Sequence, residues 1–192
     1  MKTAIILAAG YGKKMWPYNV TRNKAVLPIA NRPLILWQVH ELRQAGIEQI
    51  LVVVDYRKEQ LLSLFHDDAG IRLITHPGLT GTAAAVLAGL AGLDDENILI
   101  CYGDVLVTAA DILAVMNRHR QDQAPATVLL NPLAEEKPNE WLCAQQQAGR
   151  LEYVLGHPRD SVGHRFAGVF ALNKTFRPFL SANPGQIGRA HV

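Results

Sequence analysis

Short runs of apolar residues without polar alternation recur along the first hundred positions. This pattern is typical of strands buried on both faces of a parallel sheet. It predicts four strands, at residues 4–9, 50–54, 71–75 and 97–101. Apolar positions at helical spacing predict helices at 33–44, 58–66, 82–93 and 109–120. The side chains expected to face the core in the first two helices are Leu34, Trp37, Val39, Leu42, Leu61, Leu62 and Phe65.

Strands and helices that alternate at this spacing form parallel strands joined by right-handed crossovers. After residue 120 the pattern changes, and strands are expected at 127–130, 141–144, 150–155 and 166–172 without regular helices between them. The predicted fold class is therefore α/β: a Rossmann-like open, mostly parallel sheet with helices on both faces and a mixed or antiparallel C-terminal extension. Such a sheet binds ligands beyond the carboxyl ends of its strands, and the site is expected there.

The composition indicates one globular domain. The 192 residues are 49% hydrophobic and 19% charged, so they can bury a core without a disulfide or a metal. A net charge of +2 gives no support for nucleic acid as a partner. No apolar stretch of this sequence approaches the ~20 residues of a membrane helix, so no membrane association is expected. Cys101 and Cys143 form no C-x-x-C pair and are expected as reduced core residues of a cytoplasmic protein.

The first expected strand leads into the glycine loop Gly10-Tyr11-Gly12-Lys13-Lys14. Glycines let backbone N–H groups approach a phosphate closely. The basic residues that precede the first acid, Glu41, are Lys2, Lys13, Lys14, Arg22, Lys24 and Arg32. A cationic loop of this kind attracts a polyanion such as a nucleoside triphosphate; the alternative is a structural turn with solvated lysines. Met15 stands where the dinucleotide fingerprint has its third glycine, and the G-K-[ST] of a Walker loop is missing.

Residues 7–17, with 23–28 and 32–34 after them, resemble the signature of the sugar-1-phosphate nucleotidylyltransferases. The likeness continues at 81–85 and 99–104 and, more faintly, at 167–170. The resemblance implies a nucleotide-diphospho-sugar transferase fold. It also implies transfer of a nucleotidyl group from a nucleoside triphosphate to a sugar 1-phosphate, with release of pyrophosphate and with Mg²⁺ as cofactor.

The same resemblance assigns the residues of the site. Lys14 and Lys24 fall on the two key cationic positions and Asp104 on the carboxylate that binds Mg²⁺, although an aspartate here is also compatible with a simple turn. The residues implied at the nucleotide are Leu7, Ala8, Ala9, Gly10, Gly12, Lys13, His76, Gly81, Thr82, Tyr102 and Gly103. Those implied at the sugar phosphate are Leu142, Gly156, His157 and Gly168.

Several positions depart from the family pattern. Lys14 replaces an arginine, which keeps the charge but loses the bidentate fork. Asn23 replaces a proline and is expected to relax the loop that holds Lys24. His76 stands near the glutamine with which pyrimidine-specific members read the base, so the base stays open.

Departures on the sugar side leave the acceptor open. The family's E-K-P becomes Gly156-His157-Pro158, its backbone-contacting glycine becomes Leu142, and an asparagine becomes Phe166. Two alternatives therefore stand beside the sugar-1-phosphate enzyme. One is a catalytically impaired regulatory homologue that binds a nucleotide sugar, and the other is a cytidylyltransferase for a non-sugar phosphate such as phosphocholine.

The expected domain covers residues 1–186 and is incomplete at its C-terminus, because family members continue with elements that carry a second metal ligand and close the sugar site. Residues 187–192 resemble the translation of a sequencing adapter. We therefore expect weak activity and marginal stability of this chain. The sequence leaves open whether the longer parent forms a homo-oligomer.

Overall fold

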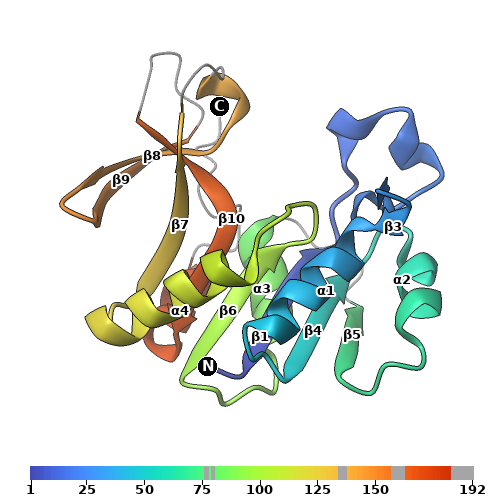
Figure 1. Cartoon of the computed structure of the whole chain (residues 1–192), viewed down its shortest axis with the longest axis horizontal. Coiled ribbons are helices and arrows are strands. Elements are labelled where there is room, and N and C mark those ends of the chain that lie inside the picture. Colours follow the sequence, from blue (N-terminus) through green and yellow to red (C-terminus); the bar gives the residue numbers. More distant parts are fainter. Residues whose placement is uncertain (76–77, 79–80, 134–137, 157–162, 183–192) are drawn as a thin grey trace.

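The computed structural model describes residues 1–75, 78, 81–133, 138–156 and 163–182. An eight-stranded sheet forms its centre, in the order β5-β4-β1-β6-β10-β8-β9, with β7 also paired to β10 (Figure 1). The strands of this sheet are β1 (Thr3–Ala8), β4 (Gln49–Val54), β5 (Ile71–Thr75), β6 (Asn97–Tyr102), β7 (Ala126–Pro132), β8 (Cys143–Gln147), β9 (Arg150–Gly156) and β10 (His164–Asn173). A separate small hairpin joins β2 (Pro28–Ile29) to β3 (Arg32–Pro33).

The parallel half of the sheet consists of β5, β4, β1 and β6. Within β1, Ala4, Ile5, Ile6 and Ala8 are fully buried. This two-sided burial explains why the strand is an uninterrupted apolar run without alternation. The prediction of a mostly parallel α/β sheet is confirmed, and each of its four strands lies within one residue of the expected bounds.

Helices cover both faces of the sheet. The helices α1 (Leu34–Gln44), α2 (Lys58–Phe65) and α4 (Ala109–Asp122) pack on one face, and α3 (Thr82–Leu90) and α5 (Arg177–Ala182) pack on the other. Figure 1 shows α1 and α4 in front of the strands and α3 behind them. The short 3₁₀ helices are η1 (Lys13–Met15), η2 (Tyr18–Val20), η3 (Lys24–Val26), η4 (Pro138–Glu140) and η5 (Lys174–Phe176).

The C-terminal extension is antiparallel, as expected. The long strand β10 pairs antiparallel with β6, β7 and β8, and β8 pairs antiparallel with β9. The register of β10 against β7 shifts between Phe166 and Phe170. Gly168 lies inside this irregularity with a φ of 81°, a conformation that favours glycine.

Three local predictions are wrong. Leu62 is 42% exposed, because Leu61 and Phe65 occupy the one face of α2 that packs on the core. Trp37 is only half-buried: it donates from Nε1 to the carbonyl of Ile29, 3.0 Å away, and packs against the β2–β3 hairpin. The strand expected at 141–144 begins at Cys143. The helix α5 was not predicted, and the proposed tail at 187–192 lies outside the described residues.

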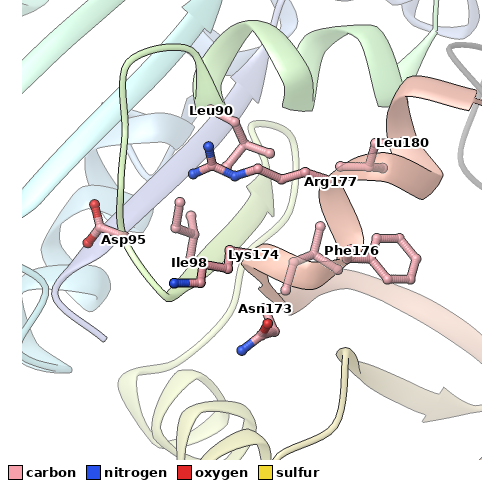
Figure 2. Close-up of a pocket in the computed structure, with 9 residues that line it drawn as sticks. Leu90, Asp95, Ile98, Asn173, Lys174, Phe176, Arg177 and Leu180 are labelled. Carbon is pink, nitrogen blue, oxygen red and sulfur yellow. The ribbon is translucent and has the colours of Figure 1, made fainter.

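The C-terminal helix joins the sheet beside α3. Figure 2 shows Arg177 and Leu180 approaching Leu90 from the other side of a small hollow. Arg177 donates from Nη2 to the carbonyl of Leu93, 2.7 Å away. The hollow has a volume of about 10 Å³, which is about the room that one water molecule needs. A substrate therefore cannot bind there.

Candidate active site

The carboxyl ends of β1 and β6 meet at the point where the order of the strands reverses. The chain passes from β1 outward to β4 and β5, and then returns to place β6 on the other side of β1. A reversal of this kind opens a crevice beyond the strand ends. At its base the N–H of Gly103 donates to the carbonyl of Leu7, 2.9 Å away. A Cβ on Gly103 would lie 2.9 Å from that same oxygen, so only glycine lets the two strand ends approach this closely.

Lys24 and Asp104 form an ion pair beyond these strand ends. Lys24 Nζ lies 2.8 Å from Asp104 Oδ2, although the two residues are 80 positions apart in the sequence. The lysine side chain runs along the glycine loop: a Cβ on Gly12 would lie 3.4 Å from its Cβ and Cδ, and one on Gly10 would lie 3.6 Å from its Cε. The two side chains are 22% and 38% exposed, so a ligand can reach both. The structure thus brings together two of the residues that the resemblance assigns to catalysis, Lys24 and Asp104.

Asn23 anchors the loop that carries Lys24, and the expectation that it relaxes this loop is wrong. Its side chain is fully buried, and Nδ2 donates to the carbonyls of Ala8 and Tyr56 at 2.9 and 2.7 Å. Its Oδ1 accepts from the N–H of Ala25 at 2.9 Å and caps η3. Its own N–H donates to Oε1 of Gln60 at 2.8 Å. Proline offers none of these donors, so asparagine fixes the loop by a different means.

The beginning of α2 holds the same loop from outside. Arg57 Nη2 donates to the carbonyl of Val20 at 2.6 Å, and Gln60 Nε2 donates to the carbonyl of Thr21 at 2.8 Å. Sequence reasoning did not identify these residues, since single polar side chains at a helix start carry no periodic signal. They keep the loop before Lys24 in one conformation.

Lys13 and Lys14 follow Gly12, the glycine that packs on the side chain of Lys24. Both belong to η1, and both are exposed. Gly12, directly before them, has a φ of 68°, a left-handed conformation that a side chain would strain. The two cations therefore project from a surface loop, and they do not share the half-buried setting of Lys24.

The N-terminus of α3 is the second segment that the sequence predicts at the nucleotide. Gly81 precedes the helix with a φ of 90°, and no side chain of the described residues caps the first turn. The free N–H groups of such a turn, which begins at Thr82, carry the positive end of the helix dipole. Farther along, Gly89 packs so closely on β1 that a Cβ would lie 2.8 Å from Cγ2 of Ile5. His76, predicted at the nucleotide, lies outside the described residues.

The described residues that were predicted at the sugar phosphate lie in the C-terminal strands or next to them: Leu142 directly precedes β8, Gly156 ends β9 and Gly168 lies within β10. Leu142 accepts a hydrogen bond at its carbonyl from the N–H of Phe166, 2.8 Å away, and Gly156 pairs with Cys143 across the β8–β9 hairpin. His157 lies outside the described residues.

Gly168 connects this sugar side to the ion pair. A Cβ there would lie 2.8 Å from Cγ1 of Val105 and 3.3 Å from Cδ2 of Tyr102. Since Tyr102 and Val105 flank the Gly103–Asp104 turn, Gly168 borders the strand end that presents Asp104.

An additional cation that sequence reasoning missed lies on this side. The guanidinium of Arg165 lies 4.1 Å from the ring centroid of Trp141. The pair is typical of cation–π stacking, which covers one face of the ring. Their separation of 24 positions gave no signal in the sequence pattern.

The carboxylate of Asp104 fits a metal ion that is held jointly by the protein and by the phosphates of a bound nucleotide. The described residues contain no cluster of three or more His, Cys, Asp or Glu side chains that could enclose a metal. Mg²⁺ is typically held by one or two carboxylates together with phosphate oxygens and water, so Asp104 fits this role once a triphosphate is bound. Cysteine ligation does not apply: both thiols are buried, and burial raises the pKa of Cys101 to about 12.

The pattern of the MobA-like NTP transferase domain family matches residues 4–167 of this chain. The chain belongs to this family. Nucleotidyltransferases of this kind generally use a divalent metal ion. In the part of the chain that the structure describes, no helix is long and apolar enough to cross a membrane.

Relatives extend the comparison. A mannose-1-phosphate guanyltransferase of Yarrowia lipolytica is 25% identical over 191 residues, which are 95% of this chain and 52% of that protein. The bifunctional protein GlmU of Cutibacterium acnes is 32% identical over 133 residues, 67% of this chain and 31% of that protein. The crystal structure of UDP-glucose pyrophosphorylase complexed with UDP-glucose superposes with a TM-score of 0.83 at 20% identity, over 98% of this chain and 84% of that chain. The chain thus has the nucleotidyltransferase fold, and it spans about half the length of the first curated relatives.

Proposed function

We propose that the chain forms the nucleotide-binding and catalytic part of a sugar-1-phosphate nucleotidylyltransferase. The observation that carries the proposal is the Lys24–Asp104 pair, with Nζ and Oδ2 2.8 Å apart at the ends of β1 and β6. At one point in a crevice, a cation can hold substrate phosphates and a carboxylate can hold a divalent metal ion. Relatives that are named for this reaction support the assignment.

The proposed substrates are a nucleoside triphosphate and a sugar 1-phosphate. An oxygen of the sugar phosphate attacks the α-phosphorus and forms a new P–O bond. The bond from the α-phosphorus to the bridging oxygen of the β-phosphate breaks, and pyrophosphate leaves with the electron pair. Lys24 offsets the charge that builds on the phosphate oxygens, while Lys13 and Lys14 bind the triphosphate from the rim. Asp104 holds Mg²⁺, which when bound neutralises charge on the reacting phosphates.

The remaining predicted residues take supporting roles in this proposal. Backbone groups next to the nucleotide come from Leu7, Ala8, Ala9, Gly10, Gly12, Gly81, Thr82, Tyr102 and Gly103. Those next to the sugar phosphate come from Leu142, Gly156 and Gly168. The residues of this set act through main-chain atoms or packing, which is why glycine and small residues dominate it.

The test measures pyrophosphate release and nucleotide binding by this chain. ATP, CTP, GTP, UTP and dTTP are supplied in turn with Mg²⁺ and mannose 1-phosphate, glucose 1-phosphate or N-acetylglucosamine 1-phosphate. We expect Lys24→Ala to lower turnover about 100-fold or more. Lys2→Ala is the matched control, because Lys2 also pairs with a carboxylate, that of Glu48, but lies at the amino end of β1. Failure of the wild-type chain to bind any of these nucleotides would refute the proposal.

The same assay shows which class of compound accepts the nucleotidyl group. Turnover with phosphocholine and with none of the sugar 1-phosphates would move the protein to the non-sugar class. Tighter binding of a nucleotide sugar than of any of the five nucleoside triphosphates, without turnover on any acceptor, would support the regulatory homologue. Calorimetry on the same samples separates these outcomes, since it detects binding independently of pyrophosphate.

A further inference from the structure

Two fully buried carboxamides lie at the base of the Lys24–Asp104 site. Asn23 and Gln38 are both 0% exposed, whereas amide side chains are mostly found at protein surfaces. Asn23 donates from Nδ2 to the carbonyl of Ala8 at the end of β1. Gln38 reaches from α1 to the end of β6, where its Nε2 donates to the carbonyl of Tyr102 at 2.7 Å. A buried amide therefore acts beside each half of the ion pair: Asn23 ties η3, which carries Lys24, to the end of β1, and Gln38 holds the end of β6 before Asp104.

Gln38 holds the backbone two residues before Asp104. The other end of the same peptide group is fixed as well, because the N–H of Gly103 donates to the carbonyl of Leu7 at 2.9 Å. The peptide between Tyr102 and Gly103 is thus held from both ends, by a helix and by a strand, and Asp104 is the residue that follows it. With the backbone set in this way, its carboxylate reaches Lys24 at 2.8 Å.

Stability alone does not explain a glutamine at this position. Gln38 Oε1 is buried and has no hydrogen-bond partner among the described residues. A buried acceptor without a partner forfeits its hydration and gains nothing in return. An apolar side chain of the same shape would avoid this loss, and its neighbours Ile35, Val39 and Leu42 on the same helix are apolar and buried.

We propose that Gln38 is a positioning residue of the active site, which sets Asp104 opposite Lys24 through the carbonyl of Tyr102. The inference rests on the proposed function, because positioning matters only if Asp104 and Lys24 bind metal and phosphates together. A displacement of about 1 Å in a catalytic group lowers rates by about 100-fold, so a hydrogen bond that fixes a strand end has a large effect on chemistry.

The first test replaces Gln38 by methionine, which keeps the length and shape but removes the donor. Gln44→Met is the matched control, since Gln44 is exposed at the end of the same helix. The probe is Mn²⁺ with whichever of ATP, CTP, GTP, UTP and dTTP the wild-type chain binds most tightly, and free Mn²⁺ is followed by electron paramagnetic resonance. We expect Gln38→Met to weaken Mn²⁺–nucleotide binding about tenfold and to lower kcat more than it changes KM, with an unchanged or raised midpoint of urea unfolding.

The second test uses Gln38→Glu and keeps the proposal falsifiable if the methionine variant does not fold. A protonated carboxyl can still donate to the carbonyl of Tyr102, whereas a carboxylate cannot, and burial favours the protonated form. Mn²⁺–nucleotide affinity of this variant should therefore be near that of the wild type at low pH and fall as pH rises. The wild type and Gln44→Glu provide the reference, and neither should show this fall.

The outcomes separate the two proposals. If the wild-type chain binds Mn²⁺ and nucleotide but Gln38→Met binds equally well, or Gln38→Glu shows no additional pH dependence, the positioning role is overturned and the proposed function stands. A loss of binding free energy that is matched by an equal loss of unfolding free energy, obtained from the urea midpoint, would also overturn it, because the effect is then structural. If the wild-type chain binds no nucleotide, the proposed function fails and the positioning role fails with it.

Discussion

Gly103→Ala tests whether the close approach of β1 and β6 builds the site. The added Cβ would lie 2.9 Å from the carbonyl oxygen of Leu7, 3.2 Å from Cβ of Ala8 and 3.4 Å from Cβ of Ala25. None of these atoms is at the end of a flexible side chain, so the two strand ends must separate by a few tenths of an ångström. The hydrogen bond from the N–H of Gly103 to the carbonyl of Leu7 lengthens at the same time.

The expected loss follows from three contributions. Overpacking in a buried site costs about 1–3 kcal/mol, and loss of the hydrogen bond costs about 0.5–1.5 kcal/mol. The smaller conformational freedom of alanine in the unfolded chain offsets about 0.4–1 kcal/mol. The free energy of unfolding should therefore fall by about 2 kcal/mol. With a typical dependence of about 2 kcal/mol per molar urea, the midpoint of unfolding falls by about 1 M.

Urea unfolding of Gly103→Ala and Gly163→Ala side by side measures this effect. A Cβ added at Gly163 would have no described atom within 4 Å, and the φ of this residue is an ordinary one, so its replacement should leave the midpoint unchanged or slightly raised. The Gly103 variant should in addition lose Mn²⁺–nucleotide binding, because Asp104 is the next residue. A Gly103→Ala midpoint equal to that of Gly163→Ala would refute the reasoning.

Three further predictions concern the core. Gly89→Ala should lower the free energy of unfolding by about 1 kcal/mol. The added Cβ would lie 2.8 Å from Cγ2 of the buried Ile5, and this clash exceeds the gain in helix propensity. Urea unfolding measures the change, and a more stable variant would contradict the prediction. Burial lowers the pKa of His119 from 6.5, so the unfolded chain takes up a proton that the folded chain does not, and stability should fall as pH drops below about 6.5. The difference in unfolding midpoint between wild type and His119→Gln should follow that pH range, and a difference independent of pH would count against it. Cys101 and Cys143 should react with Ellman's reagent only in denaturant, since both are buried and burial raises both pKa values; rapid reaction of the native chain would show that the thiols are accessible.

The parallel half of the fold could be predicted from the sequence because strands that are buried on both faces form uninterrupted apolar runs. Residues of β1 face helices on both sides, so polar residues are absent from the strand interior. Gly10 separately marks the end of the apolar run. The meeting of Lys24 and Asp104 could be anticipated for a related reason. The carboxyl ends of parallel strands lie at one edge of the sheet, and a family resemblance supplied a residue in the segment that follows each of β1 and β6.

The anchors of the site could not be predicted, because they are polar residues in buried positions. A periodic pattern identifies inward positions by apolar residues, so it assigned Trp37 inward and passed over Gln38 beside it. Asn23 was interpreted as a loosened proline position, yet its backbone N–H and side chain make hydrogen bonds to partners as distant as Gln60. Such partners come from tertiary packing, which no local window of sequence contains.

The charges of the site form two groups, the half-buried Lys24–Asp104 pair and the exposed lysines of the glycine loop. Lys24 and Asp104 cancel each other at short range, so the attraction that a distant triphosphate experiences comes from the exposed Lys13 and Lys14. Added salt screens such exposed charges strongly and the half-buried centre much less. Ionic strength should thus slow the arrival of the nucleotide more than it hastens its departure.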